Sequence, residues 1–194
     1  SHRSLILTGQ AVGKSEITNL LEGEDVINTL LVMRELGARI TKKNGKYIVF
    51  GIPPGALFQP KKQLDFGNSG TGIRLLAGLI SSNNIKAALK GDKSLSKRPM
   101  RRVTDHLKRI GASIELKKNS FPPIKIKGVG DAIPLNYDIK IPSAQIKSGI
   151  ILASLFAEGK TTVIEKNITR DHTENMLNYF GANIDIKKNN SETF

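Results

Sequence analysis

The stretch 67–80, GNSGTGIRLLAGLI, combines glycines, small polar residues and an arginine in a way that could bind an anion. Glycines let backbone N–H groups approach a ligand, and the first N–H groups of a helix have no internal partner and carry the positive end of the helix dipole. A carboxylate or phosphate is stabilised there. The loop alone is not specific, because Asn68 or Ser69 could simply cap the helix. Neither the Walker nor the Rossmann fingerprint fits its glycine spacing.

A second candidate group lies in the stretch 91–102, GDKSLSKRPMRR. A dense run of basic residues is usually a solvated face, and we assign Lys97, Arg101 and Arg102 to one. Arg98 differs because it directly precedes Pro99, which we expect to be the first residue of a helix. A guanidinium fixed at that point can bind a carboxylate or phosphate through two parallel hydrogen bonds.

The start of another apolar helix, Pro142-Ser143-Ala144-Gln145, carries a third group. Ser143 is predicted to be the N-cap. The amide of Gln145, two residues into an apolar helix, can donate to a ligand oxygen or accept from a hydroxyl. Lys147 either does the same or extends its ammonium to solvent.

The run Thr169-Arg170-Asp171-His172-Thr173-Glu174 also precedes or opens a helix. Thr169 is predicted to cap it, and its acidic residues suit the helix dipole. Arg170 could face an anion, whereas His172 is assigned to the surface. The sequence contains no cysteine and no cluster of His, Asp and Glu with metal-ligand spacing, so we expect neither a metal nor a thiolate.

An internal repeat explains how these groups are positioned. The pattern Gly-Ala-x-Ile occurs at 37–40, 111–114 and 181–184, and each copy is predicted to end a helix and begin a strand. A basic residue precedes each copy at a nearly constant distance, namely Arg3, Arg74 and Lys147, and marks the start of an earlier apolar helix. The predicted second helices are Asp25–Leu36, Pro99–Ile110 and Asp171–Phe180.

Short β-like runs complete each unit, at 16–20, 47–50, 63–66, 85–89, 124–126, 138–141 and 161–165. The resulting order of elements is βαβαββ. The first unit has no room for its opening strand, so we expect the chain to begin inside a repeat, and the third ends before its last strand. The predicted fold is an α+β domain of three units with pseudo-threefold symmetry, helices buried and sheets outside. If the first helices converge, their starts share one positive pocket.

Composition limits the possible partners. The chain has 194 residues, a net charge of +13, 5% aromatic residues and no Trp. Lysine pairs near strand ends mainly protect sheet edges, and binders of single-stranded nucleic acid combine basic residues with aromatic ones, so nucleic acid is disfavoured. No apolar run is long enough to span a membrane and Ser-His-Arg does not start a signal peptide, which predicts a cytoplasmic location without membrane contact.

Taken together, these motifs resemble those of the 5-enolpyruvylshikimate-3-phosphate synthase family, class II-like, over essentially the whole chain. The matching stretches, in family order, are SHRSLIL, LLEGEDV, GNSGTGIRLL, GDKSLSKRPMRRV, PSAQIKSGIILA and TRDHTENML. The resemblance implies transfer of the enolpyruvyl group of phosphoenolpyruvate to the 5-hydroxyl of shikimate 3-phosphate, without metal or cofactor. It also implies one half of a two-domain inside-out α/β barrel, with the substrates between the halves.

The resemblance also assigns the site residues. Those expected to bind shikimate 3-phosphate are Arg3, Ser143, Ala144, Gln145 and Arg170. Those expected to bind phosphoenolpyruvate are Asn68, Gly70, Thr71, Arg98 and Gln145, with Ser69 beside them.

Two elements of the family pattern are not in the sequence. A Lys-Ser pair is expected just upstream of Ser1, and the acidic residues credited with proton transfer belong to a second domain. Residues 1–194 are therefore expected to be the N-terminal domain, inactive by itself, monomeric, and completed by its own C-terminal domain. The alternatives are a basic anion- or nucleic-acid-binding module and the sister UDP-N-acetylglucosamine enolpyruvyltransferase, which uses a cysteine in many members.

Overall fold

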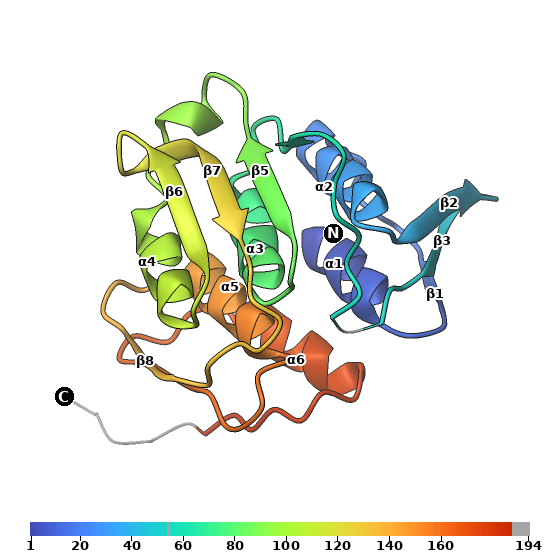
Figure 1. Ribbon diagram of the computed structural model, residues 1–194. Coiled ribbons are helices and arrows are strands. Elements are labelled where there is room, and N and C mark those ends of the chain that lie inside the picture. The colour runs from blue at the N-terminus through green and yellow to red at the C-terminus, as the bar shows by residue number, and fades with distance from the viewer. Residues whose placement is uncertain (54, 188–194) are drawn as a thin grey trace.

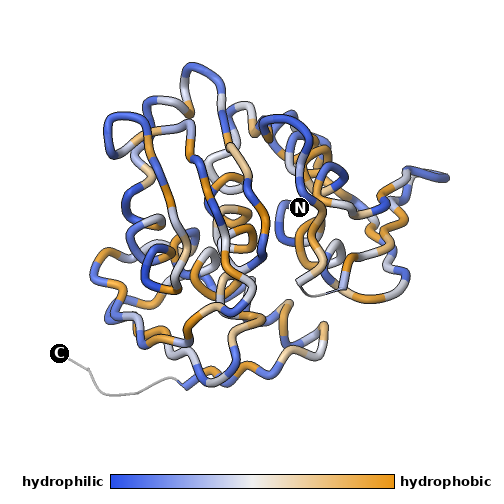
Figure 2. The backbone as a smooth tube through the Cα atoms, viewed as in Figure 1, coloured by the Kyte–Doolittle hydropathy of each residue, from blue (hydrophilic) through white to orange (hydrophobic). Residues whose placement is uncertain are grey.

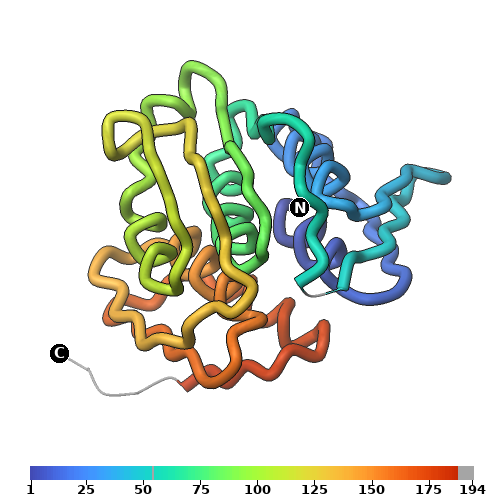
Figure 3. The backbone as a smooth tube through the Cα atoms, in the orientation of Figure 1, coloured from blue at the N-terminus to red at the C-terminus, as the bar shows by residue number. Residues whose placement is uncertain are grey.

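The protein consists of three successive structural units, each with its own small sheet. The computed structural model describes residues 1–53 and 55–187. In Figure 3 the units follow one another around the molecule, from blue and cyan through green and yellow to orange and red. The predicted division into repeats is therefore visible in the path of the chain.

The first unit packs two helices against a three-stranded antiparallel sheet. The strand order is β1-β3-β2, so β3 pairs with both neighbours. Tyr47 and Val49 of β3 are buried while the flanking residues are exposed, as the period of two in a half-buried strand requires. The elements of this unit are α1 (His2–Gln10), β1 (Lys14–Ile17), α2 (Glu24–Glu35), β2 (Arg39–Lys43) and β3 (Lys46–Phe50).

The second unit contains the complete predicted order βαβαββ. Its sheet has the order β4-β5-β7-β6, in which β4 and β5 are parallel and the other pairs antiparallel. Figure 1 shows this sheet in front of α3 and α4. The elements are β4 (Leu64–Asp65), α3 (Gly70–Ser81), β5 (Lys86–Lys90), the 3₁₀ turn η1 (Leu95–Lys97), α4 (Arg101–Arg109), β6 (Ser113–Lys117) and β7 (Phe121–Lys127).

Helix α4 begins later than the sequence predicts. Pro99 was expected at its first position, but the helix starts at Arg101 with Met100 as the N-cap. The N–H of Met100 donates to the carbonyl of Ser120 at 2.7 Å, a contact with the turn before β7 that holds this residue outside the helix. Arg98 therefore lies on extended backbone between η1 and the helix cap.

The third unit is smaller and corrects one prediction. Its elements are β8 (Asn136–Ile139), α5 (Ala144–Ser154), β9 (Thr162–Glu165) and α6 (His172–Tyr179), with β8 and β9 parallel. The strand predicted from residue 181 is not there: residues 182–187 contain no strand. In the other units the equivalent strand, β2 or β6, pairs only with the last strand, β3 or β7. Residues 136–187 provide no such partner, so the backbone there has no strand to bond with.

The first helix of each unit lies inside and the sheets lie outside. Ten consecutive or near-consecutive residues of α3 are buried, as are nine of α5 and the second half of α1. Figure 2 shows hydrophobic and hydrophilic residues alternating along the outer strands. Burying these apolar helices removes large side chains such as Leu75, Leu76 and Ile150 from water, worth about 1.5–3 kcal/mol each. The predicted fold class is confirmed.

Two glycines allow the inner helices α3 and α5 to touch backbone to backbone. A Cβ atom added at Gly78 would lie 2.0 Å from the carbonyl oxygen of Gly149. On the other side of the contact, a Cβ at Gly149 would lie 3.0 Å from the carbonyl oxygen of Arg74. Any side chain at Gly78 must therefore push the two helices apart.

We expect Gly78→Ala to destabilise the protein by about 1–3 kcal/mol or more, because overpacking a rigid contact forces the backbones apart. Gly130→Ala is the matched control, since its added Cβ would find its nearest neighbour, the Cβ of Asn84, at 3.8 Å. Urea titration of both variants measures the free energy of unfolding. Equal stabilities of the two variants would contradict the close contact.

Candidate functional site

The loop in front of α3 is shaped by its own hydrogen bonds. The side chain of Ser69 accepts from the N–H of Gly72 at 3.0 Å and caps the helix. Gly67 has a φ of +52°, and a Cβ there would meet the amide nitrogen of Asn28 at 2.3 Å. Asn68 is exposed between them. At the start of α3, Gly70 and Gly72 are buried and Thr71 is partly exposed.

Asp65, the acidic residue nearest this loop, has a structural role. Its carboxylate accepts from the N–H of Gly67 at 3.0 Å and pairs with Lys90 at 2.9 Å. The hydrogen bond from Lys90 lowers the pKa of Asp65, and the bond from Gly67 adds to this. The carboxylate is therefore ionised and engaged within the second sheet.

The N-termini of α3 and α5 lie side by side. The amide nitrogen of Gln145 donates to the hydroxyl of Thr71 at 3.0 Å, which joins the second residues of the two helices. The start of α1 is tied to the same region, because Arg3 donates to Ser148 in α5 at 3.0 Å. The convergence of helix starts expected from the repeat is present in the structure.

Arg74 lies between the N-termini of α3 and α5 and has no carboxylate partner among the described residues. One of its terminal nitrogens donates to the carbonyl of Gly70 at 2.8 Å and to the side-chain oxygen of Gln145 at 3.1 Å. The other donates to the carbonyl of Pro99 at 3.3 Å. Burial lowers the pKa of Arg74, and the positive charges of Arg98 and a neighbouring arginine lower it further. Its basic character at the head of α3 was the only signal in the sequence for this role.

Arg98 lies against the same glycine. A Cβ added at Gly70 would lie 3.0 Å from a terminal nitrogen of Arg98 and 2.9 Å from one of Arg74, so both guanidinium groups border the start of α3. Arg98 is exposed, and among the described residues its guanidinium donates only to the hydroxyl of Ser94, at 3.3 Å. Within residues 1–53 and 55–187, neither guanidinium forms a salt bridge. Two uncompensated cations at a helix N-terminus form an arrangement that suits an anion.

The neighbours of Arg98 are exposed, as predicted. Lys97, Arg101 and Arg102 are solvated, and Arg101 pairs with Asp105 one turn along α4, at 3.4 Å. This run therefore contributes one residue to the site and otherwise a charged surface.

One turn further along α5, Arg3 is held by two hydroxyl groups, those of Ser148 and Thr173. Its Nε donates to Thr173 at 2.7 Å and its Nη2 to Ser148 at 3.0 Å. Burial lowers the pKa of Arg3, and the positive charge of Arg170 lowers it further. Arg170 itself is exposed.

The first turn of α5 has the predicted capping arrangement. The hydroxyl of Ser143 accepts from the N–H of Ile146 at 3.4 Å, and Ala144 behind it is buried. Ser143 and Gln145 remain partly accessible. Arg98 and Arg3 thus belong to two groups that both contact the first turns of α5, one through Arg74 and Gln145 and the other through Ser148.

Lys147 and Thr169 are corrections to the sequence analysis. Lys147 does not reach the helix starts or solvent; it is buried and pairs with Glu165 at 2.7 Å and Glu174 at 2.6 Å. Thr169 does not cap α6, whose N-cap is Asp171 without a side-chain cap bond; its hydroxyl donates to Glu165 at 2.6 Å. Both residues bind Glu165, and no sequence pattern indicated this partner.

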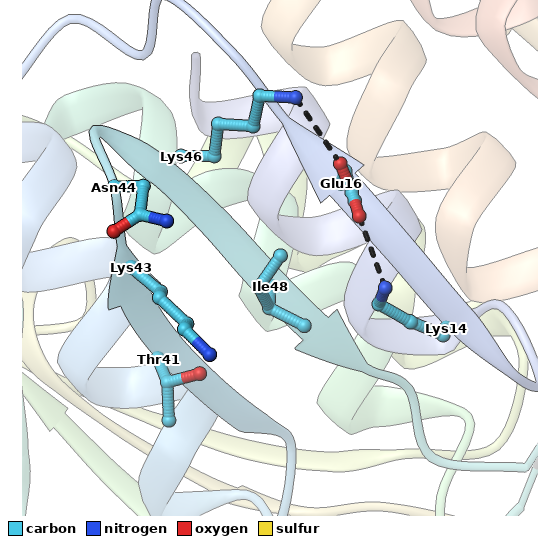
Figure 4. A pocket seen from close by; sticks show the side chains of 7 residues that line it. All are labelled: Lys14, Glu16, Thr41, Lys43, Asn44, Lys46 and Ile48. Carbon is cyan, nitrogen blue, oxygen red and sulfur yellow. Dashed lines mark hydrogen bonds and ion pairs between the residues drawn. The ribbon is translucent and has the colours of Figure 1, made fainter.

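Two surface hollows lie away from these helix starts. Figure 4 shows one on the outer face of the first sheet, where Glu16 bridges Lys14 at 3.0 Å and Lys46 at 3.6 Å. A second lies between α4 and β6, lined by Arg101, Asp105, Lys108, Ile114, Glu115, Leu116 and Asn119. None of the residues predicted to bind substrate lines either hollow.

A family model described as EPSP synthase (3-phosphoshikimate 1-carboxyvinyltransferase) matches residues 1–193 of the sequence. The chain belongs to the EPSP synthase family. Its inner helices, outer sheets and arginine-bearing helix starts are thus features of a member of that family. Among the residues described, no helix is long and apolar enough to cross a membrane.

Several relatives carry the same enzyme name. The chain is 47% identical over 188 residues to a 3-phosphoshikimate 1-carboxyvinyltransferase of Granulibacter bethesdensis, covering 96% of this chain and 41% of the relative. It is 48% identical over 187 residues to one of Brucella abortus, covering 96% and 42%. An EPSP synthase structure from Acinetobacter baumannii superposes with a TM-score of 0.90 at 42% identity, covering 97% of this chain and 42% of that one. The chain therefore spans about two fifths of the length of these relatives.

The buried Lys147 cluster yields a stability prediction. We expect Lys147→Met to cost about 3–5 kcal/mol, because it leaves the carboxylates of Glu165 and Glu174 buried without their cation. Replacing both glutamates by glutamine in the same variant should recover most of that loss. Lys42→Met, which removes an exposed pair with Glu22, is the control and should change little. Urea unfolding at neutral pH measures all of these.

The pH matters for that measurement. Burial by itself would lower the pKa of Lys147, but the hydrogen bonds to Glu165 and Glu174 outweigh it and raise the pKa. The stabilisation is therefore complete below the usual lysine pKa and is lost as the pH rises through the raised value. A Lys147→Met variant as stable as the Lys42→Met control would contradict the cluster.

Proposed function

We propose that the chain is the shikimate-3-phosphate-binding half of a 3-phosphoshikimate 1-carboxyvinyltransferase. This enzyme transfers the enolpyruvyl group of phosphoenolpyruvate to the 5-hydroxyl of shikimate 3-phosphate and releases phosphate. Residues 1–194 form its N-terminal domain, a C-terminal domain of the same protein completes the site, and the whole enzyme is a monomer acting in the cytoplasm. Membership of the family supports the reaction, and the chain's share of its relatives' length supports the division into domains.

The pair of guanidinium groups at Gly70 carries the proposal. Phosphoenolpyruvate bears a carboxylate and a phosphate, and Arg98 offers it a planar fork that no described carboxylate occupies. Gly70 and Thr71 add the N–H groups of the first turn of α3, and Asn68 stands exposed at the edge of the loop. Gln145, bonded to Thr71, borders this half of the site.

The second group of residues suits shikimate 3-phosphate. Arg3 and Arg170 provide two positive charges, and the charge of Arg170 is felt at Arg3, where it lowers the pKa of the guanidinium; a phosphate would offset this repulsion. The start of α5 offers a hydroxyl, backbone N–H groups and an amide to the hydroxylated ring of shikimate 3-phosphate, from Ser143, Ala144 and Gln145. Gln145 then lies between the two substrates.

In this reaction the 5-hydroxyl oxygen bonds to C2 of phosphoenolpyruvate as its C3 methylene gains a proton. The tetrahedral intermediate then loses phosphate and a C3 proton. The described residues supply binding, orientation and charge stabilisation. Three carboxylates close to the helix starts are engaged in other contacts: Asp25 with His2, Asp65 with Lys90, and Glu174 with Lys147. The acid and base groups are therefore proposed to come from the C-terminal domain and from a lysine upstream of Ser1.

Binding and turnover test the proposal separately. We expect the isolated chain to bind shikimate 3-phosphate weakly, with amide shifts in NMR spectra at Arg3, Ser143, Gln145 and Arg170, and to bind phosphoenolpyruvate hardly at all. It should release no phosphate, because positioned acid and base groups each contribute about 10² to 10⁴ in rate. Activity should return when the complementary domain is added.

Two outcomes would refute the proposal. Shifts confined to other residues would remove the site assignment. Salt-sensitive binding to generic DNA, without a response to shikimate 3-phosphate, would favour a nucleic-acid-binding module instead.

Arg98→Lys in the full-length enzyme tests the phosphoenolpyruvate side. The substitution keeps the charge but replaces a two-pronged contact by a single ammonium, so the KM for phosphoenolpyruvate should rise by about tenfold or more while that for shikimate 3-phosphate changes little. Arg101→Lys, three residues away and paired with Asp105, is the control and should leave both unchanged. Equal changes in both KM values for Arg98→Lys would mean that Arg98 is a solvated surface charge without a specific role in binding phosphoenolpyruvate.

A further inference from the structure

A buried polar cluster lies where α1, α5 and α6 meet, and it holds Arg3 from behind. The hydroxyls of Ser148 in α5 and Thr173 in α6 are 2.7 Å apart, and both residues are only 1% exposed. Arg3 donates to each of them, at 3.0 and 2.7 Å. Neither hydroxyl is among the residues assigned to the substrates above.

The protons of this cluster can be placed by counting donors. Ser148 has one hydroxyl proton, and its Oγ lies 2.6 Å from the carbonyl oxygen of Ala144, which can only accept. The proton between the two hydroxyls must therefore come from Thr173, which donates to Ser148. Both hydroxyl oxygens then present lone pairs to Arg3, and the chain of bonds ends on the first residue of α5.

This arrangement uses one edge of the Arg3 guanidinium and leaves the other. Nε and Nη2 bond to the two hydroxyls, whereas Nη1 has no hydrogen-bond partner within residues 1–53 and 55–187. The outer edge retains Nη1 and the second proton of Nη2, which suffice for a bidentate contact with a phosphate or carboxylate. A free arginine side chain loses rotamer entropy on being fixed, and here that loss is incurred before the ligand arrives.

The neighbouring residues fix the two hydroxyls in register. Lys147 precedes Ser148 in α5, Glu174 follows Thr173 in α6, and this second pair forms the buried salt bridge of 2.6 Å. Two adjacent cross-links thus join the same two helices, and each restricts the rotation of one helix relative to the other.

We propose that Ser148 and Thr173 are positioning residues, which hold Arg3 with its outer edge presented to the anionic group of the substrate bound at the α5 N-terminus. The inference rests on the proposed function for the identity of that substrate, shikimate 3-phosphate. It goes beyond the proposed function in assigning the orientation of Arg3 to two side chains that do not touch the ligand.

The test uses Thr173→Val and Thr173→Ser in the full-length enzyme. Valine has the shape of threonine but cannot accept from Arg3 or donate to Ser148, so the KM for shikimate 3-phosphate should rise about tenfold, as for loss of a charge-assisted hydrogen bond, with that for phosphoenolpyruvate unchanged. Serine restores the hydroxyl and should bring the KM to within about twofold of the original. Thr104→Val is the matched control: Thr104 is a buried helical threonine whose hydroxyl bonds only to the carbonyl of Met100.

A merely structural role gives a different result. Thr173→Val and Thr104→Val would then lower the melting temperature alike and leave the ratio of the two KM values unchanged. In an Arg3→Ala background, moreover, Thr173→Val should have no further effect on the KM for shikimate 3-phosphate if it acts through Arg3. An undiminished effect in that background, or failure of Thr173→Ser to rescue, would overturn the proposal.

A measurement without substrate separates this inference from the proposed function. The Nε proton of Arg3 should give a distinct NMR signal that exchanges slowly with water, and Thr173→Val should accelerate its exchange by about tenfold or more, while Thr104→Val should not. A protected proton in a protein that ignores shikimate 3-phosphate would defeat only the proposed function. A protein that binds shikimate 3-phosphate with an unprotected Arg3 proton would defeat only the inference.

Discussion

The contact between Gly78 and Gly149 is the constraint on which the rest of the structure depends. Because no side chain separates α3 from α5, their backbones touch, and the helices can lie close enough for their N-termini to share a hydrogen bond between Thr71 and Gln145. Two orphaned sets of N–H groups and two dipole ends then point at one region. The apolar remainder of both helices must be covered, and the sheets do this from outside.

The cations in and around the helix starts have two kinds of partner. Lys147 is neutralised by Glu165 and Glu174, and its role is to join α5 to β9 and α6. Arg74 and Arg98 bond to carbonyls, an amide and a hydroxyl, but to no described carboxylate. Carbonyl oxygens satisfy donors without cancelling charge. The positive potential is therefore retained at the helix starts and cancelled behind them, which is the distribution that an anion site needs.

The residues of the candidate site also differ in how firmly their side chains are held. The polar groups around Gln145 and Arg3 are fixed by contacts from several helices, so that they need little reordering when a ligand binds. The exposed members, Arg98 and Arg170, carry charge at the rim. A second domain closing over this face would meet preordered polar groups with two exposed arginines at their margin, which fits the proposed sharing of the site between two domains.

The sequence by itself determined the repeat, most element positions and the cap Ser143, because periodicity and capping are local. The repeat also predicted that the helix starts lie together, since equivalent elements of a repeat take equivalent places. Only the tertiary structure decided which side chains meet across helices. Lys147 was expected near the site and is buried with two glutamates, Arg74 bonds to Gln145, and Arg3 reaches Thr173 at the far end of the chain. Tertiary structure also decided that residues 182–187 form no strand, because a strand needs a partner strand to bond with. Helical spacing tells which face a residue occupies, but its partner depends on how helices pack, and here two glycines set that packing.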